Sequence, residues 1–151
     1  MQKYDITVKL PEGWQSESET YLDESGVEIT HFEAHLYDSV GSKDRGMIEI
    51  YAGDMPDGTT AEDQAFSNYA DIVGFDDDDP EDFNPIVKWK FNNRNAYGFD
   101  ALCEDDSPLR FFTQEPSKGV LVIYCIAGAD EKQLAAVLEL VERNARVTLK
   151  K

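Results

Sequence analysis

The stretch Val120-Leu121-Val122-Ile123-Tyr124-Cys125-Ile126-Ala127 decides how this chain folds. Apolar residues occupy both of its parities, which predicts a strand buried on both faces and therefore central in a sheet. Asp130 follows it as a typical helix N-cap, and the apolar residues between Leu134 and Ala145 then repeat at helical spacing. We expect this helix to cover one face of the central strand, and a second helix to cover the other.

The rest of the chain predicts further strands and one more helix. Thr60 and Asp63 match a capping box, and Gly74 stands where a C-terminal glycine belongs. The polar residues 15–26 predict either a loop or a short edge strand. Asn92 and Asn93 lie in a hairpin-like turn. Alternating or apolar patterns predict strands over residues 4–10, 27–37, 47–52, 86–91, 97–103 and 109–114.

These elements predict an α+β fold. Short connections between consecutive strands favour an antiparallel sheet, here of about six or seven strands flanked by helices as an α/β/α sandwich. The sequence shows no internal repeat and no clear linker, so residues 1–151 form one globular domain.

The charge of the chain is concentrated in one half. Of 31 acidic residues, 21 fall between Glu12 and Asp82, together with only two basic ones, Lys43 and Arg45. This segment carries 19 net negative charges, whereas the rest of the chain is slightly positive and the total is −17. Such an imbalance argues against nucleic acid and anionic membrane as partners, and it is compatible with a basic protein. It also predicts a soluble monomer.

The first residues, the apolar runs and the cysteines indicate a cellular compartment. The first ten residues lack the apolar core of a signal peptide, and the longest apolar run is far shorter than the roughly 20 residues that span a bilayer. Cys103 and Cys125 form neither a metal spacing nor a disulfide framework, and we expect both to be reduced and buried. The sequence therefore predicts a cytoplasmic protein, unless a signal peptide has been removed from it.

His31-Phe32-Glu33-Ala34-His35 resembles a metal-binding motif. On a strand, His31, Glu33 and His35 share one face, but the two histidines then lie about 13 Å apart, too far for one zinc ion. The alternation of Phe32 and Ala34 favours the strand. We therefore interpret the histidines as part of a solvent-facing strand surface, and we expect no metal site and no cofactor.

Two other regions are candidates for binding a partner. The acidic run contains Asp76, Asp77, Asp78, Asp79, Glu81 and Asp82. It lacks the ligand spacing of an EF-hand, so a solvated loop is favoured over a calcium site, and its charge suits a basic partner. Arg110 and Phe112 share one parity of their strand and would form an anchor if Phe112 were exposed.

The sequence contains no recognisable catalytic signature. There is no nucleophile elbow, dinucleotide-binding glycine motif, phosphate-binding loop or CxxC pair. Carboxylates are so abundant that pairs of them carry no information about glycosidase-type chemistry. The sequence therefore favours a protein that is not an enzyme.

The opening Leu10-Pro11-Glu12-Gly13-Trp14 after one strand, with the order of elements that follows, resembles PsbP-like domains. That group includes photosystem II PsbP subunits, Ran-release factors and bacterial effector-chaperone families. The resemblance covers nearly the whole chain in element order and five residues in local motif. It implies an antiparallel sheet between helices and a non-enzymatic role in binding other macromolecules, although fold analogy alone does not assign a function.

Three hypotheses about function remain open at this point. The first is a cytoplasmic interaction or accessory domain whose acidic half meets a basic protein partner. The second is a carboxylate-based or metal-dependent hydrolase, which would require convergent acids with strongly raised pKa values. The third is a soluble structural accessory whose acidity serves solubility alone.

Overall fold

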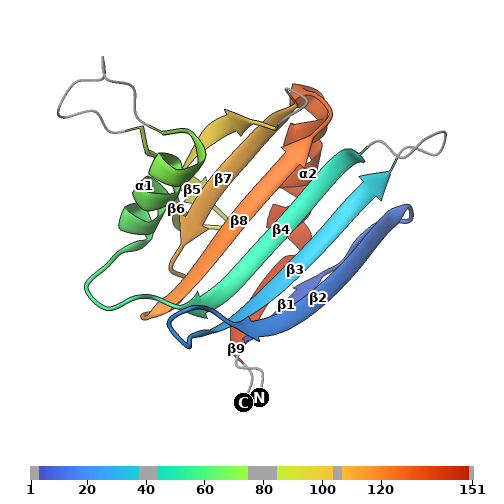
Figure 1. The fold of residues 1–151 in the computed structure, drawn as a ribbon. Coiled ribbons are helices and arrows are strands. Elements are labelled where there is room, and N and C mark those ends of the chain that lie inside the picture. Colours follow the sequence, from blue (N-terminus) through green and yellow to red (C-terminus); the bar gives the residue numbers. More distant parts are fainter. Residues whose placement is uncertain (1–3, 38–43, 75–84, 104–106, 150–151) are drawn as a thin grey trace.

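A computed structural model describes residues 4–37, 44–74, 85–103 and 107–149. Its main feature is a seven-stranded sheet in which every neighbouring pair is antiparallel (Figure 1). In spatial order the strands are β2 (Trp14–Leu22), β3 (Glu28–Tyr37), β4 (Asp44–Asp54), β8 (Val120–Gly128), β7 (Pro108–Gln114), β6 (Arg94–Leu102) and β5 (Val87–Phe91).

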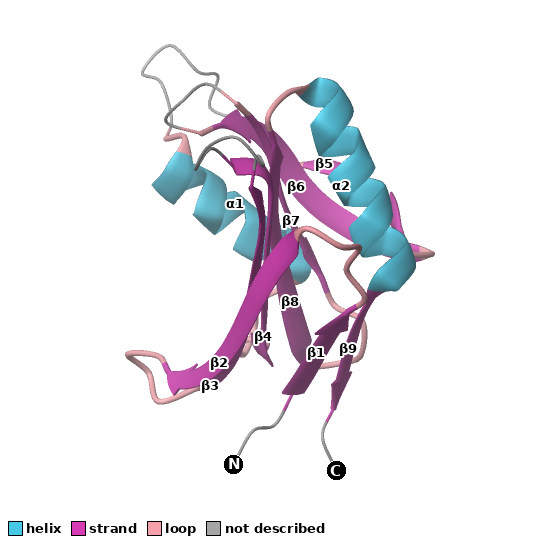
Figure 2. Cartoon of the chain, turned by 90° about the vertical axis from the view of Figure 1, so that its right-hand side faces the viewer, coloured by secondary structure: helices cyan, strands magenta, loops and turns pink. Residues whose placement is uncertain are grey.

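The two helices lie on opposite sides of this sheet (Figure 2). Helix α1 (Ala61–Ile72) packs on β6 and β7, and helix α2 (Glu131–Asn144) packs mainly on β8 and β4. Strands β1 (Tyr4–Val8) and β9 (Ala145–Leu149) pair with each other on the α2 side, where β1 also contacts β3 and β4. The predicted α+β sheet flanked by helices is therefore confirmed.

The side of the sheet that meets α2, β1 and β9, called here the closed face, holds the main core. The cross-strand pairs Ile48↔Ile126 and Ile50↔Tyr124 lie at its centre. Aromatic rings extend this core toward β5, with the rings of Phe112 and Tyr124 stacked 4.7 Å apart. Leu134, Val137 and Val141 of α2 complete it, as their helical spacing predicts.

Helix α1 is held at the other side by its own cap and by contacts with the sheet. The Thr60 hydroxyl accepts a hydrogen bond from the Asp63 N–H at 3.1 Å, and the Asp63 carboxylate accepts one from the Thr60 N–H at 2.9 Å, which is the predicted capping box. The buried Thr113 hydroxyl donates to the Ala61 carbonyl at 2.5 Å. The bond from Thr113 ties the start of α1 to β7, in the part of the sheet that the helix covers.

The central strand is where predicted, but its coverage differs from the prediction. β8 is the fourth of seven strands, which confirms its central position. α2 covers one of its faces, whereas α1 lies over β6 and β7 and meets β8 at the cluster of Ala61, Met55 and Leu121. The second face of β8 is therefore only partly covered by a helix, because the anchoring of α1 displaces it toward the sheet edge.

Several element boundaries also differ from the expectations. The polar segment after Pro11 forms a full nine-residue edge strand, β2, rather than a loop or a short strand. The last helix ends at Asn144, and Ala145 begins β9, which was not predicted. Asn92 and Asn93 take φ values of 54° and 65°, which confirms the tight hairpin between β5 and β6. Within the described residues, neither helix has the length and apolar character needed to cross a membrane.

Candidate functional site

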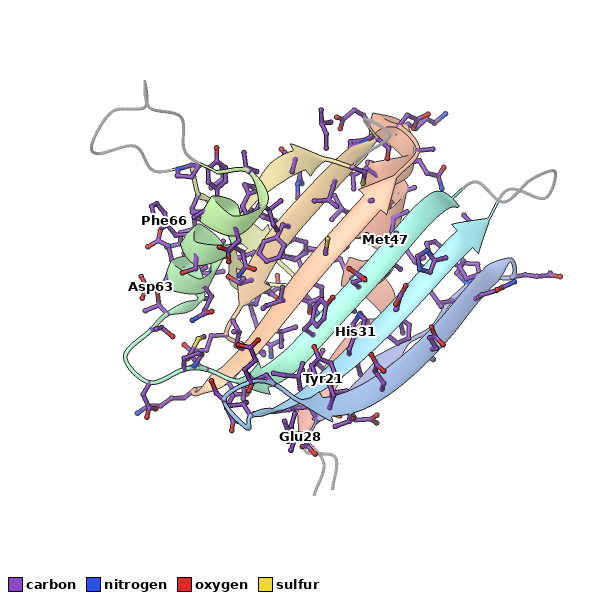
Figure 3. The ribbon with its side chains drawn as sticks, in the orientation of Figure 1. Tyr21, Glu28, His31, Met47, Asp63 and Phe66 are labelled. Atoms are coloured by element: carbon purple, nitrogen blue, oxygen red, sulfur yellow. The ribbon has the colours of Figure 1, made fainter. Side chains whose placement is uncertain are left out.

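On the side of α1, the outer surface of β2, β3 and β4 carries no helix in the described part of the chain (Figure 3). Because side chains alternate along a strand, Phe32 and Ala34 lie in the core and the residues on either side of each point outward. The same alternation in β4 buries Ile48 and Ile50. We call the outward set the open face; it consists of Glu17, Glu19, Tyr21, His31, Glu33, His35, Met47, Glu49 and Tyr51.

Three glutamates stand in one row across the open face. Glu17 is directly opposite Glu33 in the register of β2 and β3, and Glu33 is directly opposite Glu49 in that of β3 and β4. Like charges in directly opposite positions destabilise a sheet. The row continues on β8 with Cys125, which pairs with Glu49. The open face therefore carries an electrostatic strain that a cationic ligand or partner would relieve.

His31 lies beside this row in a fixed orientation. Its ring stacks on that of Tyr51 with centroids 4.3 Å apart and planes within 2° of parallel. Its Nδ1 atom is 3.6 Å from Glu19 Oε1, and its Nε2 atom is 3.7 Å from Glu49 Oε1. The side chain is only 11% exposed, and its buried Nε2 atom has no hydrogen-bond partner among the described residues.

The neighbouring Glu33 is oriented by the second histidine. His35 Nε2 lies 2.6 Å from Glu33 Oε1, a close contact between two side chains of the same strand. One oxygen of the Glu33 carboxylate is thus engaged by His35. His31, Glu33 and Glu49 can each present one nitrogen or oxygen atom such that all three atoms lie within 4.8 Å of one another.

Burial raises the pKa values of two groups on β4 and β8, at the inner part of the open face. Desolvation raises the pKa of Glu49, and the nearby Glu33 charge raises it further, while His31 and His35 act in the opposite direction. Burial, with a smaller contribution from Glu49, raises the pKa of the Cys125 thiol to about 12. Glu17 and Glu19, in contrast, are exposed on the edge strand. The open face thus grades from a solvated acidic edge to a partly desolvated centre.

A shallow hollow marks the boundary between these two parts. It has a volume of about 200 Å³ and is lined by Glu17, Ser18, Glu19, His31 and Glu33. A larger hollow of about 560 Å³ lies at the start of α1 and includes Lys90 and Arg94. There the capping box already uses the backbone N–H groups of Thr60 and Asp63, so we assign no ligand to that hollow.

The structure gives different outcomes for the residues singled out from the sequence. The acidic run Asp76, Asp77, Asp78, Asp79, Glu81 and Asp82 lies outside the described residues.

The condition set for an anchor of Arg110 and Phe112, an exposed Phe112 side chain, is not met. This side chain is 0% exposed, because its parity faces the closed side of the sheet, where Phe91 and Tyr124 surround it. Arg110 pairs with Asp100 at 2.8 Å and lies over the ring of Trp89. Neither residue therefore presents a free anchor.

The histidine motif is on a strand, as predicted, and His31, Glu33 and His35 share one face. Its interpretation as a solvent-facing surface is wrong for His31, which Tyr51 covers. The prediction was limited to ligands within a single strand. Glu49, which lies beside them on the next strand, was therefore missed as a member of the cluster. The predicted antiparallel pairing of the two strands was the one feature that could have indicated a ligand on the second strand. However, a register shift between Leu36 and Tyr37 made the pairing impossible to assign from spacing alone.

The cysteines are both free, as expected, but each is partly rather than fully buried. Cys125 lies on the open side of β8, beyond the reach of α1, which explains its residual exposure.

Comparison of the chain with protein-family models, with curated proteins and with solved structures finds no match.

Proposed function

We propose that this chain is a non-enzymatic interaction domain whose open face binds a basic segment of a protein partner. The observation that carries the proposal is the half-covered sheet, where four glutamates, Glu17, Glu19, Glu33 and Glu49, share one surface on which no lysine or arginine side chain is described. The resemblance to PsbP-like domains supports it as an analogy. The proposal keeps the cytoplasmic location and monomeric state expected from the sequence.

The edge of the open face is suited to the first encounter. Glu19 is 69% exposed, and its neighbour Glu17 is exposed as well, so both keep their hydration until a partner arrives. Charges at such a rim act mainly on the association rate and on its salt dependence. The partly buried Glu33 and Glu49 would then pair with cationic groups that enter the face more deeply. A lysine- or arginine-rich strand or loop has the matching chemistry.

The test compares two double variants that each remove two negative charges. Glu17→Gln with Glu19→Gln changes the open face, whereas Glu131→Gln with Glu139→Gln changes exposed positions on α2, at the other side of the sheet. Each immobilised protein is used to capture proteins from a lysate at low salt, and the retained proteins are identified and released by increasing salt. We expect at least one basic protein to be retained by the wild type and the α2 variant, and at least tenfold less by the open-face variant.

Equal retention by both double variants would show that the open face is not the binding surface. Retention that depends on neither salt nor variant would contradict the electrostatic mechanism as a whole. If no basic protein is retained by the wild type, the acidity serves solubility alone, which is the structural-accessory hypothesis.

A further inference from the structure

We propose that His31, Glu33 and Glu49 form a binding site for a first-row divalent transition-metal ion of the zinc type. The site lies at the inner part of the open face, between β3 and β4. One potential ligand atom from each residue lies within 4.8 Å of the other two. A nitrogen with two carboxylate oxygens is a donor set that such ions accept. The ion would bind without a protein partner, and it would compete with the partner's cationic groups for Glu33 and Glu49.

The arrangement of His31 is the strongest support. The Nε2 atom is buried, lacks a hydrogen-bond partner among the described residues, and lies 3.7 Å from Glu49 Oε1. A buried polar atom without a partner is costly to a fold. A metal ion between Nε2 and the Glu49 carboxylate would satisfy both groups. Two ligands of a tetrahedral zinc ion lie about 3.4 Å apart, so this pair needs almost no adjustment.

The surroundings of His31 are those expected of a metal ligand. Glu19 lies 3.6 Å from Nδ1, where its carboxylate can accept the other ring N–H once Nε2 binds an ion. The stacked ring of Tyr51 fixes the plane of the imidazole. The orientation of the His31 ring is therefore set before an ion arrives.

The carboxylate of Glu33 is also oriented before an ion binds. His35 engages its Oε1 atom at 2.6 Å, which orients the carboxylate and leaves the other oxygen for an ion. Glu33 and Glu49 are directly opposite each other, so a divalent cation between them would turn a repulsive pair into two attractive contacts. The partly buried position of Glu49 strengthens this attraction, because the local dielectric is lower than that of water.

The donor set also distinguishes between classes of ion. Calcium takes six to eight oxygen ligands, and magnesium keeps most of its water and prefers oxygen alone. A site built on one imidazole nitrogen and two carboxylates should therefore select zinc, cobalt or manganese over both. Three protein ligands leave at least one coordination position for water or for a group from outside.

The experiment titrates the full chain, after treatment with a chelator, with zinc chloride at neutral pH and 150 mM salt in a calorimeter. We expect one ion per chain with a dissociation constant below about 10 μM, and no competition from a hundredfold excess of calcium or magnesium. His31→Gln and Glu49→Gln should each weaken binding at least tenfold. The matched control, Glu17→Gln, removes a carboxylate from the same row outside the cluster and should change binding less than threefold.

A second measurement follows zinc binding in the wild-type chain and uses one variant only to assign resonances. The wild-type chain has two histidines, so their ring proton resonances can be assigned with His35→Gln alone. Zinc should move the His31 resonances to a limit at one equivalent. Unchanged His31 resonances, binding that survives His31→Gln and Glu49→Gln, or equal displacement by calcium would each overturn the proposal.

Discussion

The two faces of the same seven strands use opposite chemistry. In β4, Ile48 and Ile50 pack into the closed face, while Glu49 between them faces outward, directly opposite Glu33. On the closed face, α2 and the β1–β9 pair exclude water from a continuous apolar core. On the open side, α1 covers β6 and β7, and no helix of the described residues covers β2 to β4. The comparison shows that alternation gives the two faces of a strand different chemistry, whereas the placement of the helices decides which face is covered.

The largest effect is expected where the closed face is packed most tightly. Phe112→Ala removes a fully buried ring that contacts Phe91, Trp89 and Tyr124. We expect it to lower the free energy of unfolding by about 3–5 kcal/mol in urea denaturation. Tyr21→Ala on the open face, where the side chain is 40% exposed, is the control and should cost less than about 1 kcal/mol. Similar costs at both positions would remove the distinction between the faces.

A smaller but still clear loss is expected from Gly98→Ala in β6. A Cβ atom at this position would lie 2.0 Å from the Phe111 carbonyl oxygen and 2.6 Å from Phe112 Cβ. Because these atoms belong to the neighbouring strand, the pair β6–β7 must separate to admit a methyl group. We expect about 1–3 kcal/mol of destabilisation by the same measurement. A neutral effect would show that the closed face is less tightly packed than the contacts indicate.

The smallest expected effect concerns the open face, and it is a gain in stability where the other two are losses. Burial raises the pKa of Glu49 above its ordinary value, so the folded state binds the proton more tightly than the unfolded state does. The charged carboxylate thus lowers stability at neutral pH, and this penalty disappears as pH falls to the unfolded pKa. In chelator-treated protein, Glu49→Gln should increase stability at pH 7 by about 0.2–1 kcal/mol.

The gain from Glu49→Gln should shrink toward pH 4, as measured by thermal unfolding across pH. Glu24→Gln, at an exposed turn position outside the row of glutamates, serves as the control and should change stability less than Glu49→Gln does at pH 7. A loss of stability at pH 7 in Glu49→Gln would mean that the attraction of His31 and His35 outweighs burial and repulsion.

Much of the secondary structure could be predicted from local chemistry. The apolar stretch of β8, the capping box at Thr60, the N-cap at Asp130 and the asparagine hairpin all act over a few residues. The full length of the polar edge strand β2 and the existence of the short β9 could not be predicted, because their strand conformation depends on partners. β2 pairs with β3, and β9 pairs with β1 from the other end of the chain.

The sequence by itself determined which side of each strand is apolar and that His31, Glu33 and His35 share a face. It also determined the acidity of the first half. Only the tertiary structure decided that Glu49 stands opposite Glu33, that Tyr51 covers His31 and that Phe112 is buried. The physical reason is that alternation is a property of one strand, whereas register, helix placement and desolvation arise from contacts between segments far apart in the chain.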